Sequence, residues 1–475
     1  MTAAAPHSDV LIVGAGSAGS VVAERLSADP SRAVTVLEAG PALTDPALLA
    51  QTANGFQLPI GAGSPLVQRY QTRLTDHPVR LLPIVRGATV GGSGAVNGGY
   101  FCRALPRDFD RLSIPGWAWP DVLASYRAIE TDLDFDGPAH GDSGPIPVRR
   151  TREMAGTTER FIAAAERAGF EWIADLNDTG PQPVSGVGAV PLNIADGVRM
   201  GSGAGFLIPA LGRSNLTLRP HTRAVRLRFA GATAVGVDAI GPEGPTSFTS
   251  DRIVLCGGAI QSAQLLMLSG IGEDDMLRNV GVPVVAPLPV GTSFSDHPEW
   301  VLPTDWAVAP GRPVLEVVLS TDDLEIRPYT GGFVTMTGEG TGGRPDWPHL
   351  GVALMRPRAR GRLTLVSRDP GAHPLIEHRY DSEPDDVAAL RQGSELAREL
   401  AGAAADVVWS TSQHLCGTAP MGAAGDPRAV VDHRCRVHGI DNLWVIDGSI
   451  LPAITSRGPH ATIVMLGHRA TEFVR

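Results

Sequence analysis

Residues 9–19 read DVLIVGAGSAG, and this stretch decides the fold. A short apolar run, too short for a helix, leads into a turn with glycines at positions 14, 16 and 19. The residues that follow, SVVAERLSAD, place apolar side chains at helical spacing. The pattern predicts a strand, a glycine turn and a helix whose N-terminus binds the pyrophosphate of a dinucleotide.

A second strand is predicted in AVTVLEAG, and it ends at Glu38. A carboxylate at this place can accept hydrogen bonds from both ribose hydroxyls, and it disfavours NADP without choosing between FAD and NAD. Strand, helix and strand together predict a parallel sheet. A glycine turn without a ligand is the alternative. The predicted nucleotide contacts in this unit are Gly14, Gly16, Ser17, Ala18, Gly19, Glu38 and Ala39.

Composition narrows the class of protein. The formal net charge of -10 over 475 residues argues against a nucleic-acid partner, which needs clustered Lys and Arg. Four dispersed cysteines and the absence of a leader-like or membrane-spanning apolar stretch lead us to expect a reducing, cytoplasmic setting, with peripheral membrane contact left open. We expect no metal site, because no ligand spacing such as HExxH is present.

Later segments indicate a discontinuous nucleotide domain. Sheet-like runs at residues 252–258 and 442–449 are expected to return to the first sheet, whereas residues 41–83 are expected to form a loop. Alternating apolar runs between Val301 and Asp381 predict an antiparallel sheet, and residues 385–402 predict an amphipathic helix. We assign residues 1–140, 200–295 and 410–475 to the nucleotide-binding domain, and residues 141–199 and 296–409 to a substrate-side cap.

Several long motifs resemble the glucose-methanol-choline (GMC) oxidoreductases over nearly the whole chain. They are RGATVGGSGAVNGGYFCRALPRDFD (86–110), GGAIQSAQLLMLSGIG (257–272), HLCGTAPMG (414–422) and the closing segment from residue 430. The resemblance implies an α/β fold with an FAD-binding Rossmann-type parallel sheet and an antiparallel-sheet substrate-binding cap domain. It implies further FAD contacts at Arg86, Gly91, Gly92, Asn97, Gly98, Val225, Asp447 and Gly448.

The same resemblance locates the chemistry at the C-terminal end. It implies that His414 faces the flavin ring as the catalytic base, a role that suits an imidazole with an ordinary pKa of about 6.5. A final helix is expected to begin near His460, so that Ala461 and Thr462 would direct N–H groups at the flavin. Some family members tether FAD through a His where this chain has Val96, so we expect noncovalent FAD.

One position departs from the family. Its second catalytic residue, a His or Asn, aligns with Gly458, and His460 lies two places later. Two interpretations of His460 are therefore open. It could reach the substrate oxygen as a second catalytic residue, or it could serve only the cofactor and the helix start.

The implied activity is oxidation of an alcohol to an aldehyde or ketone, with hydride transfer to flavin N5. We expect a dehydrogenase with an organic or protein electron acceptor, acting on a sizeable substrate or a redox-cofactor alcohol; the closing segment also resembles the branch associated with mycofactocin. The alternatives are an oxygen-using alcohol oxidase, a flavin-binding lyase, and an inactive electron-carrying flavoprotein on the same scaffold.

Overall fold

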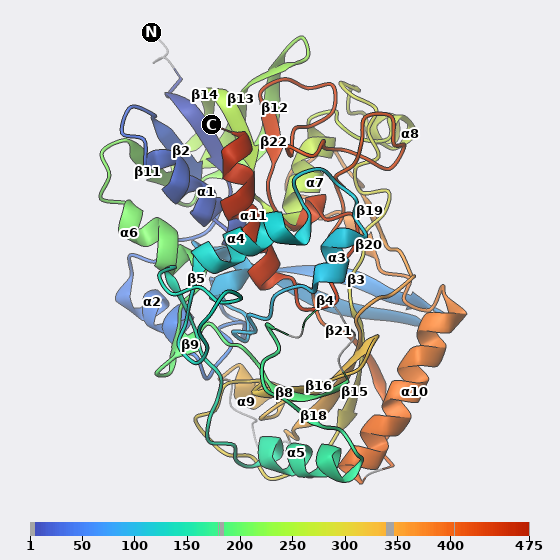
Figure 1. The fold of residues 1–475 in the computed structure, drawn as a ribbon. Coiled ribbons are helices and arrows are strands. Elements are labelled where there is room, and N and C mark those ends of the chain that lie inside the picture. Colours follow the sequence, from blue (N-terminus) through green and yellow to red (C-terminus); the bar gives the residue numbers. More distant parts are fainter. Residues whose placement is uncertain (1–4, 179, 181–184, 339–345, 403, 475) are drawn as a thin grey trace.

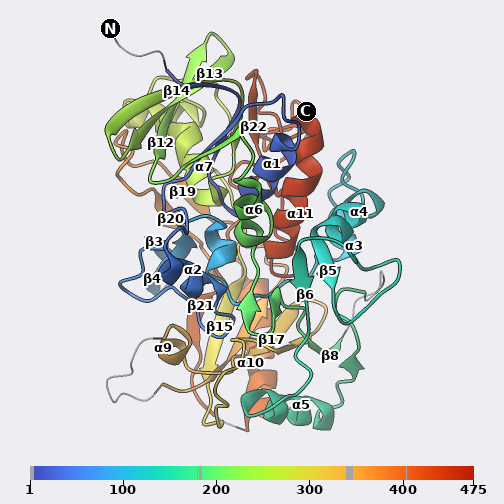
Figure 2. The same ribbon diagram turned by 90° about the vertical axis from the view of Figure 1, so that its left-hand side faces the viewer.

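The computed structural model describes residues 5–178, 180, 185–338, 346–402 and 404–474. Figures 1 and 2 show two main sheets, one at each end of the molecule, with the C-terminal helix α11 running from the first sheet toward the middle. Both chain ends lie beside the first sheet.

The first sheet is the predicted nucleotide-binding sheet. A parallel set in the order β11-β2-β1-β14-β22 forms its body, and an antiparallel hairpin, β12–β13, pairs with the first half of the long strand β14. The predicted return of residues 252–258 and 442–449 to this sheet is confirmed. Its strands are β1 (His7–Val13), β2 (Val34–Leu37), β11 (Leu216–Arg219), β12 (Arg223–Ala230), β13 (Thr233–Gly241), β14 (Gly244–Leu255) and β22 (Leu443–Val445).

The apolar run of β1 is buried because parallel strands are covered on both faces. Val10, Leu11 and Ile12 are fully buried. Helix α1 (Ser17–Ser27) follows the glycine turn and packs on α11 (His460–Ala470). A side chain at Gly467 would come within 2.8 Å of the Ala18 carbonyl oxygen, so this helix pair depends on small residues.

The second sheet is the predicted antiparallel cap. Its strand order is β21-β15-β18-β17-β16-β8-β7, and only β7 and β8 are parallel. Helices α5 (Thr157–Arg167) and α10 (Pro384–Ala401) supply apolar side chains to its core, which confirms the amphipathic helix. The strands are β7 (Trp172–Ile173), β8 (Gly186–Ala189), β15 (Pro298–Pro303), β16 (Val317–Ser320), β17 (Leu324–Pro328), β18 (His349–Leu354) and β21 (Val408–Thr411).

The predicted loop at residues 41–83 is wrong. This segment contains α2 (Pro46–Ala53), β3 (Val67–Asp76) and the start of β4 (Val79–Gly87). The Asp45 side chain caps α2, and β3 buries alternate residues that are partly polar, namely Tyr70, Thr72 and Leu74. Because Tyr70 and Thr72 carry polar groups, the alternation of buried and exposed residues in β3 does not show as an alternation of apolar and polar residues in the sequence.

Smaller elements connect the two sheets. Strands β3 and β4 form a third sheet with β19 (Arg362–Thr364) and β20 (Leu375–Glu377). Both β19 and β20 lie in the range that was assigned to the cap. The pair β5–β6 spans the proposed boundary at residue 140, so the domain division stays a prediction. The other elements are α3 (Pro106–Asp110), α4 (Trp119–Ile129), α6 (Ile208–Ala210), α7 (Gly258–Leu268), α8 (Asp274–Asn279), α9 (Phe333–Met336), β5 (Glu130–Asp132), β6 (Ile146–Val148), β9 (Ile194–Ala195) and β10 (Val198–Arg199).

A buried ionic cluster fastens β5 to the start of the cap. His140 faces carboxylates with both ring nitrogens, Asp132 at 3.1 Å and Asp175 at 3.0 Å. Arg150 binds the same two residues, at 2.5 and 2.8 Å. Burial alone would lower the pKa of His140, but the two carboxylates outweigh it and raise the pKa to about 9. His140 is therefore an imidazolium near neutral pH.

This cluster predicts a pH-dependent stability. The folded pKa of His140 lies above the unfolded value of about 6.5, so its stabilisation is complete below about pH 6.5 and is lost as the pH rises through about 9. We expect His140→Gln to lower the free energy of unfolding by about 1–3 kcal/mol near pH 6, and by less above pH 9. Denaturant unfolding at both pH values measures this, with His433→Gln, on the surface, as the control. An equal loss at both pH values would contradict the assignment.

Candidate active site

A cavity of about 470 Å³ lies between the carboxyl ends of β1 and β2 and the cap sheet. It brings together most of the predicted site residues. Those in its wall are Gly14, Gly16, Ser17, Ala18, Glu38, Ala39, Arg86, Gly92, Asn97, Gly98, His414, Asp447, Gly448 and His460. Those outside its wall are Gly19, Gly91, Val225, Ala461 and Thr462.

The predicted site residues that lie outside the cavity wall make contacts elsewhere in the structure. Gly19 lets α1 approach the Gly14 carbonyl so closely that a side chain would collide with it. The Thr462 hydroxyl is hydrogen-bonded to that of Tyr126 at 2.6 Å, so this side chain turns away from the cavity. Val225 lies at a bulge in β12, one residue beyond the lining residue Ala224.

Two glycine turns touch at the cofactor end of the cavity. Gly14 has a φ of 100°, and a Cβ there would lie 2.6 Å from the Cys256 carbonyl oxygen. A Cβ on Gly92 would lie 2.8 Å from the Gly16 Cα, so the loop of residues 91–98 packs directly on the first turn. The resulting surface is bare main chain, which is what a dinucleotide requires for close approach.

Two buried carboxylates accept hydrogen bonds from the backbone around this surface. Glu38 accepts hydrogen bonds from the Ala15 N–H at 2.9 Å and the Gly40 N–H at 2.8 Å, and burial raises its pKa. Asp447 accepts from the Gly258 N–H at 2.8 Å and the Ser262 hydroxyl at 2.6 Å, and thereby fastens the C-terminal segment to α7. The sequence did not indicate this second role of Asp447.

Unpaired polar atoms also line the cofactor end. Among the described residues, Nη2 of Arg86 and both ring nitrogens of His460 are buried without a hydrogen-bond partner. Near His460, the buried Arg199 guanidinium binds the carbonyl oxygens of residues 52, 57 and 95. Buried donors and charges without partners are costly, so this end fits a polar, anionic group such as a flavin dinucleotide.

His414 is held by a chain of hydrogen bonds that fixes its tautomer. Nε2 of His297 lies 3.0 Å from the Thr455 carbonyl oxygen, which can only accept, so this nitrogen carries hydrogen. Nδ1 of His297 is then an acceptor, and Nδ1 of His414, 2.9 Å away, donates to it. Nε2 of His414 therefore keeps its lone pair, and no described residue hydrogen-bonds to it.

Electrostatics keep both imidazoles neutral. Burial, followed by the nearby His297 and Arg327, holds the pKa of His414 well below its usual range. Burial and Arg327 lower the pKa of His297 to about 4. A neutral His414 with an unprotonated Nε2 can accept a proton near neutral pH.

His460 lies on the cofactor side. A Cβ on Gly94 would collide with Nε2 of His460, and it would also lie 2.8 Å from the Ser17 hydroxyl. Burial and Arg199 lower the pKa of His460 to about 4. The position next to the base belongs to Gly458, where a Cβ would lie 3.4 Å from Cε1 of His414. This placement favours the cofactor role over the second catalytic role.

The sequence-based prediction did not include a buried ionic cluster near His414. Arg327 binds Glu325 at 2.8 Å and Glu299 at 3.4 Å, and Arg457 binds Glu325 at 3.0 Å. All four side chains are buried. The signal was present in β17, LEIRP, where charged and apolar residues alternate.

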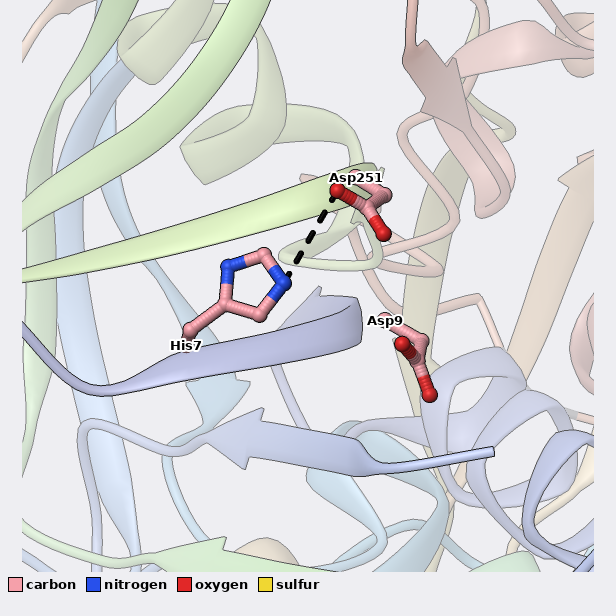
Figure 3. A group of neighbouring side chains, drawn as sticks. All are labelled: His7, Asp9 and Asp251. Atoms are coloured by element: carbon pink, nitrogen blue, oxygen red, sulfur yellow. Dashed lines mark ion pairs between the residues drawn. The ribbon is translucent and has the colours of Figure 1, made fainter. Parts of the chain in front are cut away.

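Two groups of side chains in the described part of the chain have metal-like proximity. His7, Asp9 and Asp251 lie at the other end of β1, where His7 pairs with Asp251 at 3.8 Å (Figure 3) and the Asp9 carboxylate accepts from the Ala33 N–H. The second group consists of Glu130, Asp132 and His140, and its Asp132 already binds Arg150. We propose a metal ion at neither group.

No helix in the described ranges is long and apolar enough to cross a bilayer.

A Rossmann-type sheet, a glycine-lined cavity and an imidazole over its far end define a nucleotide-dependent oxidoreductase. The chain belongs to the GMC oxidoreductase family, because residues 8–299 match its N-terminal part and residues 357–467 its C-terminal part. GMC oxidoreductases bind FAD, and their members act on CH–OH groups.

Relatives cover the whole chain. A GMC-type oxidoreductase of Rhodococcus erythropolis is 40% identical over 98% of both chains. An oxygen-dependent choline dehydrogenase of Klebsiella pneumoniae is 31% identical over 98% of this chain and 96% of its own. Among solved structures, pyridoxine 4-oxidase from Mesorbium loti superposes with a TM-score of 0.87, at 26% identity over 98% of both chains. These similarities confirm the predicted family and fold class.

Proposed function

We propose that this chain binds FAD and oxidises an alcohol to an aldehyde or ketone, with His414 as the base. Bound flavin supplies the hydride acceptor. The observation that carries the proposal is the unprotonated Nε2 of His414, which the Thr455 carbonyl fixes through His297. His414 takes the hydroxyl proton of the alcohol at this nitrogen, and the cavity walls exclude water from the reacting pair.

The glycine turns, Glu38, Arg86 and the N-terminus of α11 hold the cofactor. The first residue of α11 is His460. We assign His460 to the cofactor on the basis of its contact with Gly94. The N-terminus of α11 would present partial positive charge to a bound flavin and so favour negative charge there. The cytoplasmic setting and the mycofactocin-associated branch stay predictions.

Replacing His414 tests the base. We expect His414→Ala to slow flavin bleaching by an alcohol, in the absence of air, by roughly 100- to 10,000-fold while FAD remains bound. The matched control is His433→Ala, an exposed His in the same C-terminal region. Stopped-flow absorbance measures the rate. An undiminished rate in His414→Ala would refute the assignment, and a folded FAD-loaded protein that no alcohol bleaches would favour a lyase or an electron carrier.

Noncovalent attachment of FAD is proposed because Val96, which lines the cavity before Asn97, offers no nucleophile. Precipitation with acid should release all of the flavin into the supernatant. Colour retained in the pellet would show a covalent bond.

The electron acceptor is proposed to be an organic molecule or a protein. Phe333 supports this, because it lines the cavity and is 52% exposed, and so offers an apolar contact at the rim. The second candidate is an oxygen-using oxidase, as the names of two relatives suggest. We expect air to reoxidise the reduced protein much more slowly than an added quinone does. Reoxidation by air at the rate of turnover would establish the oxidase.

A further inference from the structure

The cap sheet presents a polar face to the cavity. Strand alternation places Leu302, Ile326 and Val352 in the core beneath α5 and α10. Glu299 and Arg327 occupy the alternate positions and line the cavity. Gly351 lies among them without a side chain because a Cβ there would collide with the Glu299 carboxylate. The sheet is therefore shaped around this carboxylate.

The charges on this face are already paired with one another. The Glu299 carboxylate accepts from the Tyr329 hydroxyl at 3.0 Å and from the Ser412 hydroxyl at 2.7 Å, besides its ion pair with Arg327. Glu325 accepts from Arg327 and, at 3.0 Å, from Arg457. Two carboxylates thus balance two guanidinium groups.

The other titratable groups at this end are uncharged near neutral pH. Burial is the main reason why the pKa values of His297, His349 and His414 are lowered. Burial raises the pKa of Tyr100 and Tyr329. Two further charges near His414, the Asp296 carboxylate and the Arg86 guanidinium, are opposite in sign, so the substrate end carries no net charge.

Apolar side chains also line this cavity. They are Val301, Val314, Leu315, Phe333 and Met336. A cation entering this end would lose its hydration and find Glu299 and Glu325 already paired, and an anion would find Arg327 and Arg457 already paired, so either would bind at a cost that an uncharged group avoids.

We propose that the substrate is an uncharged alcohol whose non-reacting part is apolar. The inference rests on the proposed function and narrows it. It separates this chain from the relatives named choline dehydrogenase, because choline carries a permanent positive charge. Here the carboxylate Glu299 is neutralised by Arg327 within the protein.

Choline and its carbon isostere, in which a quaternary carbon replaces the ammonium nitrogen, test the proposal because they differ in charge and hardly in shape. We expect the isostere to bleach the flavin anaerobically with a ratio of rate to dissociation constant roughly tenfold or more above that of choline. An equal ratio, or one that favours choline, overturns the proposal.

A variant tests the electrostatic cause. Arg327→Met leaves the Glu299 carboxylate without its cation, and we expect the preference to move toward choline by roughly tenfold. Adding Glu299→Gln should return it to the wild-type value. An unchanged preference in a folded, FAD-loaded Arg327→Met protein overturns the proposal. If that variant does not retain FAD, the wild-type comparison decides alone.

Failure of the substrate class can be told from failure of the proposed function. If neither compound bleaches the flavin, both are titrated as competitors of an alcohol that does. Competition by choline equal to or stronger than that of the isostere overturns the proposal. If no alcohol of any charge bleaches the flavin, the proposed oxidation itself fails.

Discussion

The carboxylate of Asp296 is the interaction on which the active site depends. One oxygen accepts from the backbone N–H groups of His297 and His414, each at 2.7 Å, and the other accepts from His378 at 3.1 Å and Thr411 at 3.0 Å. Burial opposes the charged form, but the hydrogen bond with His378 and the nearby Arg86 guanidinium outweigh it and hold the pKa of Asp296 well below its usual range. This single group lies just before the cap strand β15 and joins it to the end of the cap strand β21, to His378 after β20 of the third sheet, and to the segment that carries the base.

This junction explains how distant segments place one imidazole. His297 comes from the entry to the cap, His414 from the exit, and Thr455 from the loop before the last helix. Because Asp296 fixes the backbone of both histidines, their rings meet edge to face with centroids 5.1 Å apart. The fold thus determines which nitrogen of His414 can accept a proton, because the Thr455 carbonyl fixes the tautomer of His414 through His297.

The sequence predicted the features that local rules govern. The glycine turn after β1 and the second strand, which ends beside Glu38, follow from spacing and residue type, whereas the start of α11 at His460 was expected from the family resemblance. It failed at residues 41–83, where a strand buries Tyr70 and Thr72 in place of aliphatic residues. It also missed the tautomer of His414, which depends on the Thr455 carbonyl, and the pairing of Arg327 with Glu299, since contacts between distant segments leave no periodic signal.

The long strand β14 has a consequence for folding. Its second half pairs with β22, and α11 covers α1, yet both partners lie far downstream of β1 and α1 in the sequence. Until these elements dock, one edge of the parallel sheet and the apolar side of α1 are open to water. Closing the nucleotide crevice therefore requires pairing between distant segments, whose loop-closure entropy has to be overcome before the contacts form.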